Sequence, residues 1–107
     1  MGWKLEFVSD AAAAELDALP ADMRARFEWI VELIRHHGLE TVRAPHVKPL
    51  GNKLWEMRLS GRAGIARSIY LTASERRIVI LRTFVKKTRK TPAAELEIAR
   101  RRAAMMK

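Results

Sequence analysis

Four of the five residues from 86 to 90 are Lys or Arg, within the stretch "LRTFVKKTRKTP" that spans residues 81–92. A β-branched apolar run precedes them, so the charge gathers where a buried strand is expected to end. Grouped Lys and Arg can stabilise a phosphate or a transition state that develops negative charge. A Lys crowded by other cations, as Lys86 and Lys87 are, can have a lowered pKa and can act as an acid or base near neutral pH. The residue types alone leave three readings: a solvated turn, a general anion patch or a catalytic edge.

Two arginines on expected strands are further candidates. Arg67 lies within "GIARSIY", among apolar residues, which is an unusual place for an unpaired charge. Arg58 lies in "LWEMR" and shares a strand face with Glu56, because alternate residues point the same way. A structural Glu56–Arg58 ion pair and a phosphate contact by Arg58 both remain open. The same alternation places Lys86 and Lys87 on opposite faces unless the strand ends between them.

The histidines add little to this chemistry. His36 and His37 are adjacent on an expected helix and cannot bind one metal from one face, so we interpret them as helix-end residues. His46 precedes the "LWEMR" strand and is a candidate for acid–base work. No set of carboxylates and histidines has metal-ligand spacing, and no glycine-rich phosphate loop is present. The sequence therefore predicts neither a metal site nor a cofactor.

The composition favours one intracellular domain that meets polyanions. A chain of 107 residues suits a single domain, here 1–107, and the absence of Cys favours the cytoplasm. No segment approaches the roughly 20 apolar residues of a membrane span, so no membrane partner is expected. The net charge is +9, and its excess lies after residue 40, which favours encounter with nucleic acid or an acidic partner.

The elements that must position these residues follow from hydrophobic periodicity. Residues 3–8 alternate like a strand, and Ser9 or Asp10 can cap a short helix through "AAAAELDAL". A second helix begins near Pro20 and ends at Gly38, with a buried stripe of Met23, Phe27, Ile30 and Ile34. Residues 39–52 read as irregular.

Three strands and a helix are expected in the second half. The strands cover residues 53–59, 65–72 and 77–85, joined by tight turns, and the third is apolar enough for the sheet interior. Thr91 and Pro92 are expected to cap the final helix, whose apolar face carries Leu96, Ala99, Ala103 and Met106. The prediction is an α+β fold: a small, mostly antiparallel single-layer sheet, two N-terminal helices and a C-terminal helix, with the helices in one layer.

Three segments together resemble a known family: "LWEMR" (54–58), "GIARSIY" (64–70) and "FVKKTRKTP" (84–92). In order and spacing they are similar to the phage-derived Gp49-like (HigB-type) toxins of the RelE/ParE superfamily. Those proteins show a Leu-Trp-Glu-x-Arg strand, a strand with a central Arg before Tyr, and Phe-x-Lys-Lys-x-x-Lys-x-Pro before a helix. Many relatives read Tyr-Arg-Val where this chain has Ala66, Arg67 and Ser68, so an aromatic neighbour of the arginine is missing.

The resemblance implies a RelE/ParE-like fold and a type II toxin that cleaves mRNA on the ribosome without a metal. Its implied partners are mRNA, the ribosome with its 16S rRNA, and a cognate helix-turn-helix antitoxin (HigA-like). By resemblance, Lys87 takes the position of a catalytic basic residue and Arg67 that of the central-strand arginine, while Lys86 and Phe84 complete the catalytic set. Phe84 is expected to stack a base. The expected RNA- or ribosome-binding residues are Arg58, Lys53, Arg62, Arg89 and Lys90.

Two alternatives of other classes stay open. A ParE-like toxin would poison DNA gyrase without cleaving RNA. A phage accessory protein that binds nucleic acid without catalysis would need only the positive charge. The strand-end cations favour cleavage, because a gyrase poison has no chemical need for them.

Overall fold

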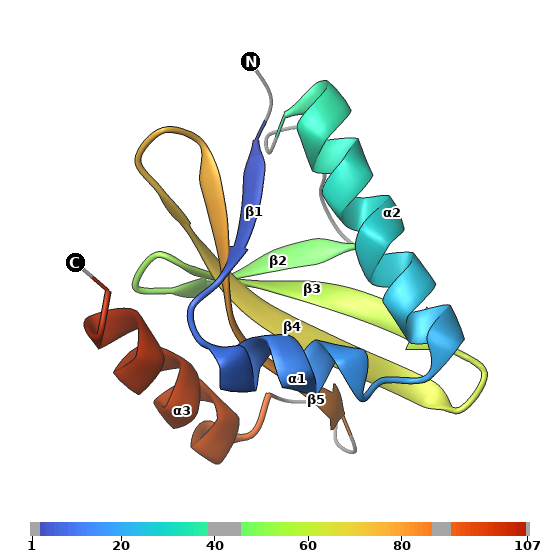
Figure 1. Cartoon of the computed structure of the whole chain (residues 1–107). Coiled ribbons are helices and arrows are strands. Elements are labelled where there is room, and N and C mark those ends of the chain that lie inside the picture. Colours follow the sequence, from blue (N-terminus) through green and yellow to red (C-terminus); the bar gives the residue numbers. More distant parts are fainter. Residues whose placement is uncertain (1–2, 39–45, 87–90, 107) are drawn as a thin grey trace.

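The computed structural model describes residues 3–38, 46–86 and 91–106 (Figure 1). Along the chain the elements are β1 (Lys4–Phe7), α1 (Asp10–Asp17), α2 (Ala21–His37), β2 (Val47–Gly51), β3 (Leu54–Gly61), β4 (Gly64–Ala73), β5 (Arg77–Lys86) and α3 (Ala93–Ala104). The strands form one sheet in the order β1-β5-β4-β3-β2. β1 pairs with β5 in parallel, and every other pairing is antiparallel. The predicted α+β class with a mostly antiparallel sheet is confirmed.

The two N-terminal helices form where the sequence predicts them. Ser9 caps α1 by accepting a hydrogen bond of 3.2 Å from the backbone N–H of Ala12. Pro20 is the N-cap of α2, one residue before the helix, and Gly38 ends the helix at a φ of 87°, which suits glycine. The expected stripe of Met23, Phe27, Ile30 and Ile34 is buried. Within the described residues, no helix is long and apolar enough to cross a membrane.

The segment expected to be irregular contains an edge strand. β2 pairs with β3 through Val47↔Met57 and Pro49↔Trp55, and the turn that follows has positive φ at Asn52. Pro49 lacks the N–H that a central strand needs, but it is tolerated at an edge. The prediction of an irregular segment, which rested on two prolines and a glycine, is therefore wrong for residues 47–51, whereas residues 39–45 lie outside the described part of the chain.

The helices cover both faces of the sheet, which corrects the expected single helical layer. α1 and α2 pack on one apolar cluster that includes Met57, Leu59, Tyr70 and Ile80. α3 packs on a second cluster, which includes Leu54, Ile69, Val79, Leu81, Phe84 and Ala99. Figure 1 shows α2 to the right of the sheet and α3 at its lower left, with α1 between them. β5 serves both clusters because its consecutive apolar residues point to opposite faces, as in a strand covered on both sides.

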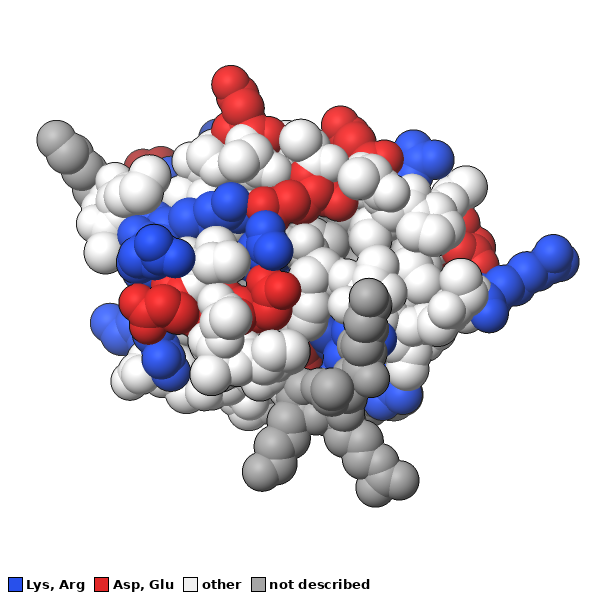
Figure 2. All heavy atoms as spheres, turned by 90° about the horizontal axis from the view of Figure 1, so that it is seen from below, with Lys and Arg blue, Asp and Glu red and all other residues white. Residues whose placement is uncertain are grey.

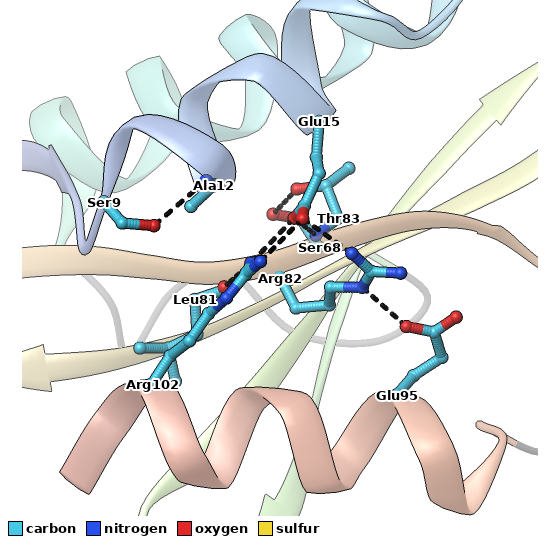
Figure 3. A network of polar contacts seen from close by, with 9 residues as sticks. All are labelled: Ser9, Ala12, Glu15, Ser68, Leu81, Arg82, Thr83, Glu95 and Arg102. Atoms are coloured by element: carbon cyan, nitrogen blue, oxygen red, sulfur yellow. Dashed lines mark hydrogen bonds and ion pairs between the residues drawn. The ribbon is translucent and has the colours of Figure 1, made fainter. Parts of the chain in front are cut away.

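Side chains from two helices complete the edge of β5 beyond the end of β1. The Thr83 backbone N–H donates to Glu15 of α1 at 3.2 Å, and Arg102 of α3 donates to the carbonyl oxygen of Leu81 at 2.8 Å. Both Nη atoms of Arg102 also donate hydrogen bonds to the Glu15 carboxylate, each at 2.9 Å (Figure 3). Arg82 donates to Glu15 as well, at 2.6 Å. These contacts satisfy edge groups that no strand covers and tie α1 to α3 around the sheet.

Candidate active site

Neighbouring strands bring Arg58, Arg67 and Lys86 to one face of the sheet. The register places Arg58 beside Arg67, and Arg67 beside Phe84. Lys86 pairs with Ile65, two residues before Arg67, and so shares its face. Lys86 is the last residue of β5 that the structure describes. The prediction that strand-end charge and the central-strand arginine belong to one surface is consistent with this register.

A buried carboxylate lies at the centre of this surface. Glu56 has no exposed surface, and its Oε1 accepts a hydrogen bond of 2.9 Å from Arg67 Nη1. Lys48 Nζ of β2 lies 3.7 Å from the same oxygen. The hydroxyl of Thr91 donates to Glu56 Oε2. The carboxylate thus joins β2, β3, β4 and the segment before α3. We call Lys48, Glu56, Arg58, Arg67 and Lys86 the sheet-face cluster.

These contacts correct two expectations. The carboxylate of Glu56 pairs with Arg67 across the strands rather than with Arg58 along its own strand. Thr91 uses its hydroxyl on Glu56, and the N-cap of α3 is Pro92 without a side-chain cap. In both cases a contact between distant segments replaces a local one.

The cluster carries more positive than negative charge, and Lys86 responds to it. Burial is the main cause that lowers the pKa of the Lys86 ammonium, and the charge of Arg67 lowers it further. Lys48 and Arg58 act in the same direction, and only Glu56 opposes them. A lysine with a lowered pKa exchanges its proton closer to neutral pH than an exposed one. Its environment therefore suits Lys86 to acid–base chemistry.

Arg67 is buried and incompletely hydrogen-bonded. The residue is 6% exposed, and within the described part of the chain its Nε has no hydrogen-bond partner. A buried guanidinium donor without a partner is costly, and it retains the capacity to bind an anion. The ion pair with Glu56 gives Arg67 a structural role in addition to any contact with a ligand. Its position beside an excess of positive charge suits a phosphate.

Phe84 is a core residue in this structure. It is 8% exposed and packs in the α3-side apolar cluster with Leu54, Ile69 and Ala99. So little exposed ring surface argues against the base-stacking role expected of it. Ala66 packs in the cluster on the α2 side, so its side chain and that of Arg67 face opposite sides of the sheet. The missing aromatic at this position is therefore a difference in the core and not in the candidate site.

The expected binding residues do not all gather at one place. Lys53 lies in the β2–β3 turn, and Arg62 lies in the β3–β4 turn at the other end of β3. Eight residues of strand separate those ends by roughly 25 Å at about 3.3 Å per residue. Arg58 lies between them, four residues from Arg62 and five from Lys53, so neither turn residue is its neighbour on the strand. The predictions for Lys87, Arg89 and Lys90 fall on positions outside the described residues.

Sequence reasoning misses Lys48, Thr91 and the pairing of Glu56 with Arg67. Lys48 escapes notice because prolines and a glycine make its segment look irregular. The signal that could have found it is "VKPLGNKLW", in which a Gly-Asn turn separates two extended segments, the pattern of a hairpin. No local signal points Thr91 at Glu56, since 35 residues separate them.

The surface is not uniformly basic. In Figure 2, which views the molecule from below Figure 1, blue groups lie directly beside red ones on the left of the face. Over residues 3–38, 46–86 and 91–106, no group of three or more His, Cys, Asp or Glu side chains is placed to hold a metal ion. Basic and acidic side chains are therefore mixed on this face.

Comparison with known proteins agrees with this architecture. A solved structure, "Crystal structure of archaeal RelE-RelB complex from Pyrococcus horikoshii OT3", contains a similar chain, with a TM-score of 0.56 and 21% identity. The match covers 79% of this chain and 96% of the other, and at that identity it shows a shared fold. No curated protein sequence matches. The family model described as "Phage derived protein Gp49-like (DUF891)" matches residues 14–104. The resemblance found in the sequence is thereby confirmed at the level of the family: this chain is a member of the Gp49-like family of phage-derived proteins.

Proposed function

We propose that the protein is a RelE-type toxin of a type II toxin–antitoxin system and that it cleaves mRNA on the ribosome in the cytoplasm. Membership of the Gp49-like family and the RelE-like fold support the toxin class. The observation that carries the proposed activity is the sheet-face cluster: Arg67 and Lys48 contact the Glu56 carboxylate, and the charges of Arg67, Lys48 and Arg58 act on Lys86. Such an excess of cations at a strand end suits a phosphodiester.

The chemistry needs four contributions. A base removes the proton of a ribose 2'-hydroxyl, the 2'-oxygen attacks phosphorus in line, cations stabilise the crowded phosphorane, and an acid protonates the leaving 5'-oxygen. Lys86, with its lowered pKa, is our candidate for one of the proton transfers. Arg67 and Arg58 are the candidates for charge stabilisation, because guanidinium groups match phosphate oxygens in two places.

Glu56 acts in this scheme as a positioning residue. Its carboxylate holds the guanidinium of Arg67 from one side and lies near Lys48 on the other. A buried carboxylate with these partners orients the arginine and limits the repulsion between neighbouring cations. It does not touch the substrate.

Lys86 and Lys87 compete for the role of the catalytic lysine. The family resemblance favours Lys87, whereas the register with Arg67 and the lowered pKa favour Lys86. Single-turnover cleavage by Lys86→Ala and Lys87→Ala at saturating toxin separates them. The catalytic variant stays slow at saturation, and a variant that lost only binding recovers.

We further propose a small antitoxin as the regulatory partner, of the helix-turn-helix HigA-like type implied by the sequence. The similar solved structure is that of a RelE-RelB complex, and a basic surface suits an acidic covering segment. Co-expression with the protein encoded next to this chain should yield a pair that co-purifies. Separate migration of the two at low salt would contradict the proposal.

Toeprinting on translating ribosomes tests the activity itself. Cuts in the ribosomal A site, dependent on both toxin and ribosome, are the expected result. Gyrase-linked DNA breaks without RNA cuts would instead support a ParE-like poison. If neither product appears with folded protein, the proposed activity is wrong and a non-catalytic nucleic-acid-binding role takes its place.

A further inference from the structure

A hollow lies between α2 and the β3–β4 turn. It has a volume of about 650 Å³ and is lined by Asp22, Ala25, Arg26, Trp29, Ser60, Gly61 and Arg62. A smaller hollow of about 370 Å³ shares Arg26 and Ser60 with it and adds His46 and Arg58. Because Arg58 also belongs to the sheet-face cluster, the two hollows continue the candidate active site toward α2.

An exposed aromatic side chain stands in the larger hollow. Trp29 is 44% exposed, whereas Met23, Phe27, Ile30, Val31 and Ile34 of the same helix are buried. The Arg26 guanidinium carbon lies 5.0 Å from the centre of the Trp29 ring, and the His46 ring meets it edge-on at 5.0 Å and 81°. A tryptophan braced by an arginine and a histidine forms a rigid platform for another flat group.

The opposite wall of the hollow is built to approach α2 closely. A Cβ at Gly61 would lie 2.7 Å from Asp22 Oδ1 and 2.8 Å from Met23 Cγ, so no larger residue fits without displacement. The Arg62 backbone N–H donates to Asp22 Oδ2 at 2.7 Å. The Asp22 carboxylate is therefore engaged with the turn, and the Arg62 side chain is left exposed. Three arginines and one engaged acid then line the two hollows.

We propose that these joined hollows are a subsite for a nucleotide of single-stranded RNA next to the cleaved bond. Its base stacks on the platform of Trp29 and Arg26, and its phosphate binds Arg62 or Arg58. This inference rests on the proposed function for the identity of the polymer. Stacking platforms combined with cationic grooves are the general means of holding single-stranded nucleic acid without strict sequence preference. An acidic protein segment would use the arginines but would leave the exposed Trp29 without a flat partner.

Binding of a short fluorescent single-stranded RNA to the full chain tests the subsite without any cleavage step. Stacking of a base on an aromatic ring is typically worth about 1–3 kcal/mol, or roughly 5- to 150-fold in affinity, and we expect Trp29→Ala to lose an amount in that range. Arg62→Ala leaves the backbone bond to Asp22 in place. It should weaken binding and reduce the slope of log affinity against log salt by about 0.7.

Asp22→Asn is a variant that should raise the affinity for RNA, in contrast to the two alanine variants. It keeps an oxygen acceptor for the Arg62 backbone N–H but removes a negative charge from the hollow, so RNA should bind more tightly. Arg24→Ala, on the same helix but lining neither hollow, is the control for loss of charge. Circular dichroism of each variant excludes unfolding as the cause.

The outcomes separate this inference from the proposed function. If wild-type protein cuts mRNA on ribosomes while Trp29→Ala and Arg62→Ala bind RNA as it does, the subsite is wrong and the function stands. If those variants lose RNA affinity but wild-type protein cuts nothing, the subsite stands and the function is wrong. If they bind RNA normally and fail only to co-purify with the neighbouring antitoxin, the hollow is a protein-binding surface and the inference is overturned.

Discussion

Two charged clusters border β5, and they differ in balance. At the edge beyond β1, the carboxylates of Glu15 and Glu95 meet Arg82 and Arg102, and both oxygens of Glu15 accept hydrogen bonds. In the sheet-face cluster, one carboxylate faces four cations, and Arg67 keeps an unpartnered Nε within the described residues. The first cluster is matched in charge, whereas the second has positive charge to spare.

The pKa shifts express the same difference. Burial alone would raise the pKa of Glu15, but hydrogen bonds from Arg102, Thr83 and Arg82 outweigh it and bring that pKa below its ordinary value. The hydrogen bond to Glu95 raises the pKa of Arg82. Glu15 and Arg82 are therefore both stabilised in their charged forms. In the sheet-face cluster the surroundings disfavour the charged form of Lys86. The network around Glu15 thus stabilises the charged forms of its members, whereas the sheet-face cluster destabilises the charged form of Lys86.

The largest effect is expected from Lys86→Ala. Loss of one transition-state donor typically costs on the order of 100- to 1,000-fold in rate, so single-turnover cleavage should fall by about that factor. Lys86→Arg keeps the charge but does not exchange a proton near neutral pH, and it should fail to restore the rate if Lys86 transfers a proton. The exposed Arg101→Ala is the control. Full activity of Lys86→Ala at saturation would exclude Lys86 from the proton transfer and leave Lys87 as the candidate; full activity of both alanine variants would make the cluster a binding patch.

Substitutions in the charge-matched cluster of Glu15, Arg82, Glu95 and Arg102 should lower the stability of the fold and leave the cleavage rate unchanged. Glu15→Ala removes the acceptor that Arg82, Arg102 and the Thr83 N–H share, and we expect a loss of about 2–3 kcal/mol in the free energy of unfolding. Urea denaturation measures it, and cleavage per folded molecule should be unchanged. Glu32→Ala is the comparison: it removes the ion pair between Glu32 and Arg35, which is 2.8 Å long but has both side chains exposed. Its expected cost is about 0–0.5 kcal/mol in the free energy of unfolding. Equal losses in the two variants would refute the comparison.

Acid should weaken the matched cluster selectively. The folded pKa of Glu15 lies below its ordinary value of 4.5, so the unfolded chain takes up the proton first as pH falls. The stabilisation is complete above that ordinary value and is lost as pH falls through the folded pKa. Wild-type stability should therefore drop more steeply below about pH 4.5 than that of Glu15→Gln. Urea unfolding at a series of pH values measures both stabilities. If the wild type and Glu15→Gln lose stability in parallel, the Glu15 carboxylate does not contribute to the acid sensitivity of the fold.

The smallest effect is a displacement of the pH–rate profile. Lys48 is half exposed, and its charge helps to lower the pKa of Lys86. Lys48→Met should raise that pKa, so the limb of the cleavage profile that Lys86 controls should move to higher pH. Single-turnover rates across the alkaline range measure the displacement. An unmoved limb would mean that another group controls it.

Much of the fold could be predicted from the sequence, because the helices and strands follow from the spacing of apolar residues along the chain. The buried stripe from Met23 to Ile34, the capping Ser9 and the three strands of the second half depend on neighbours a few residues apart. The concentration of cations at the end of β5 is equally a property of local sequence. The family followed from three short segments and is confirmed by the match over residues 14–104.

Only the tertiary structure decided what those residues touch. Glu56 takes its partners from β2, β4 and the segment before α3, and the burial of Phe84 depends on α3 covering the second face of the sheet. Trp29 and Arg62 line one hollow because Gly61 lets a turn approach α2. Cross-strand register and packing between distant segments set these contacts, and local periodicity carries no information about either. The sequence by itself therefore determined which charges and helices this protein has, while long-range packing decided which charges lie together and how they are balanced.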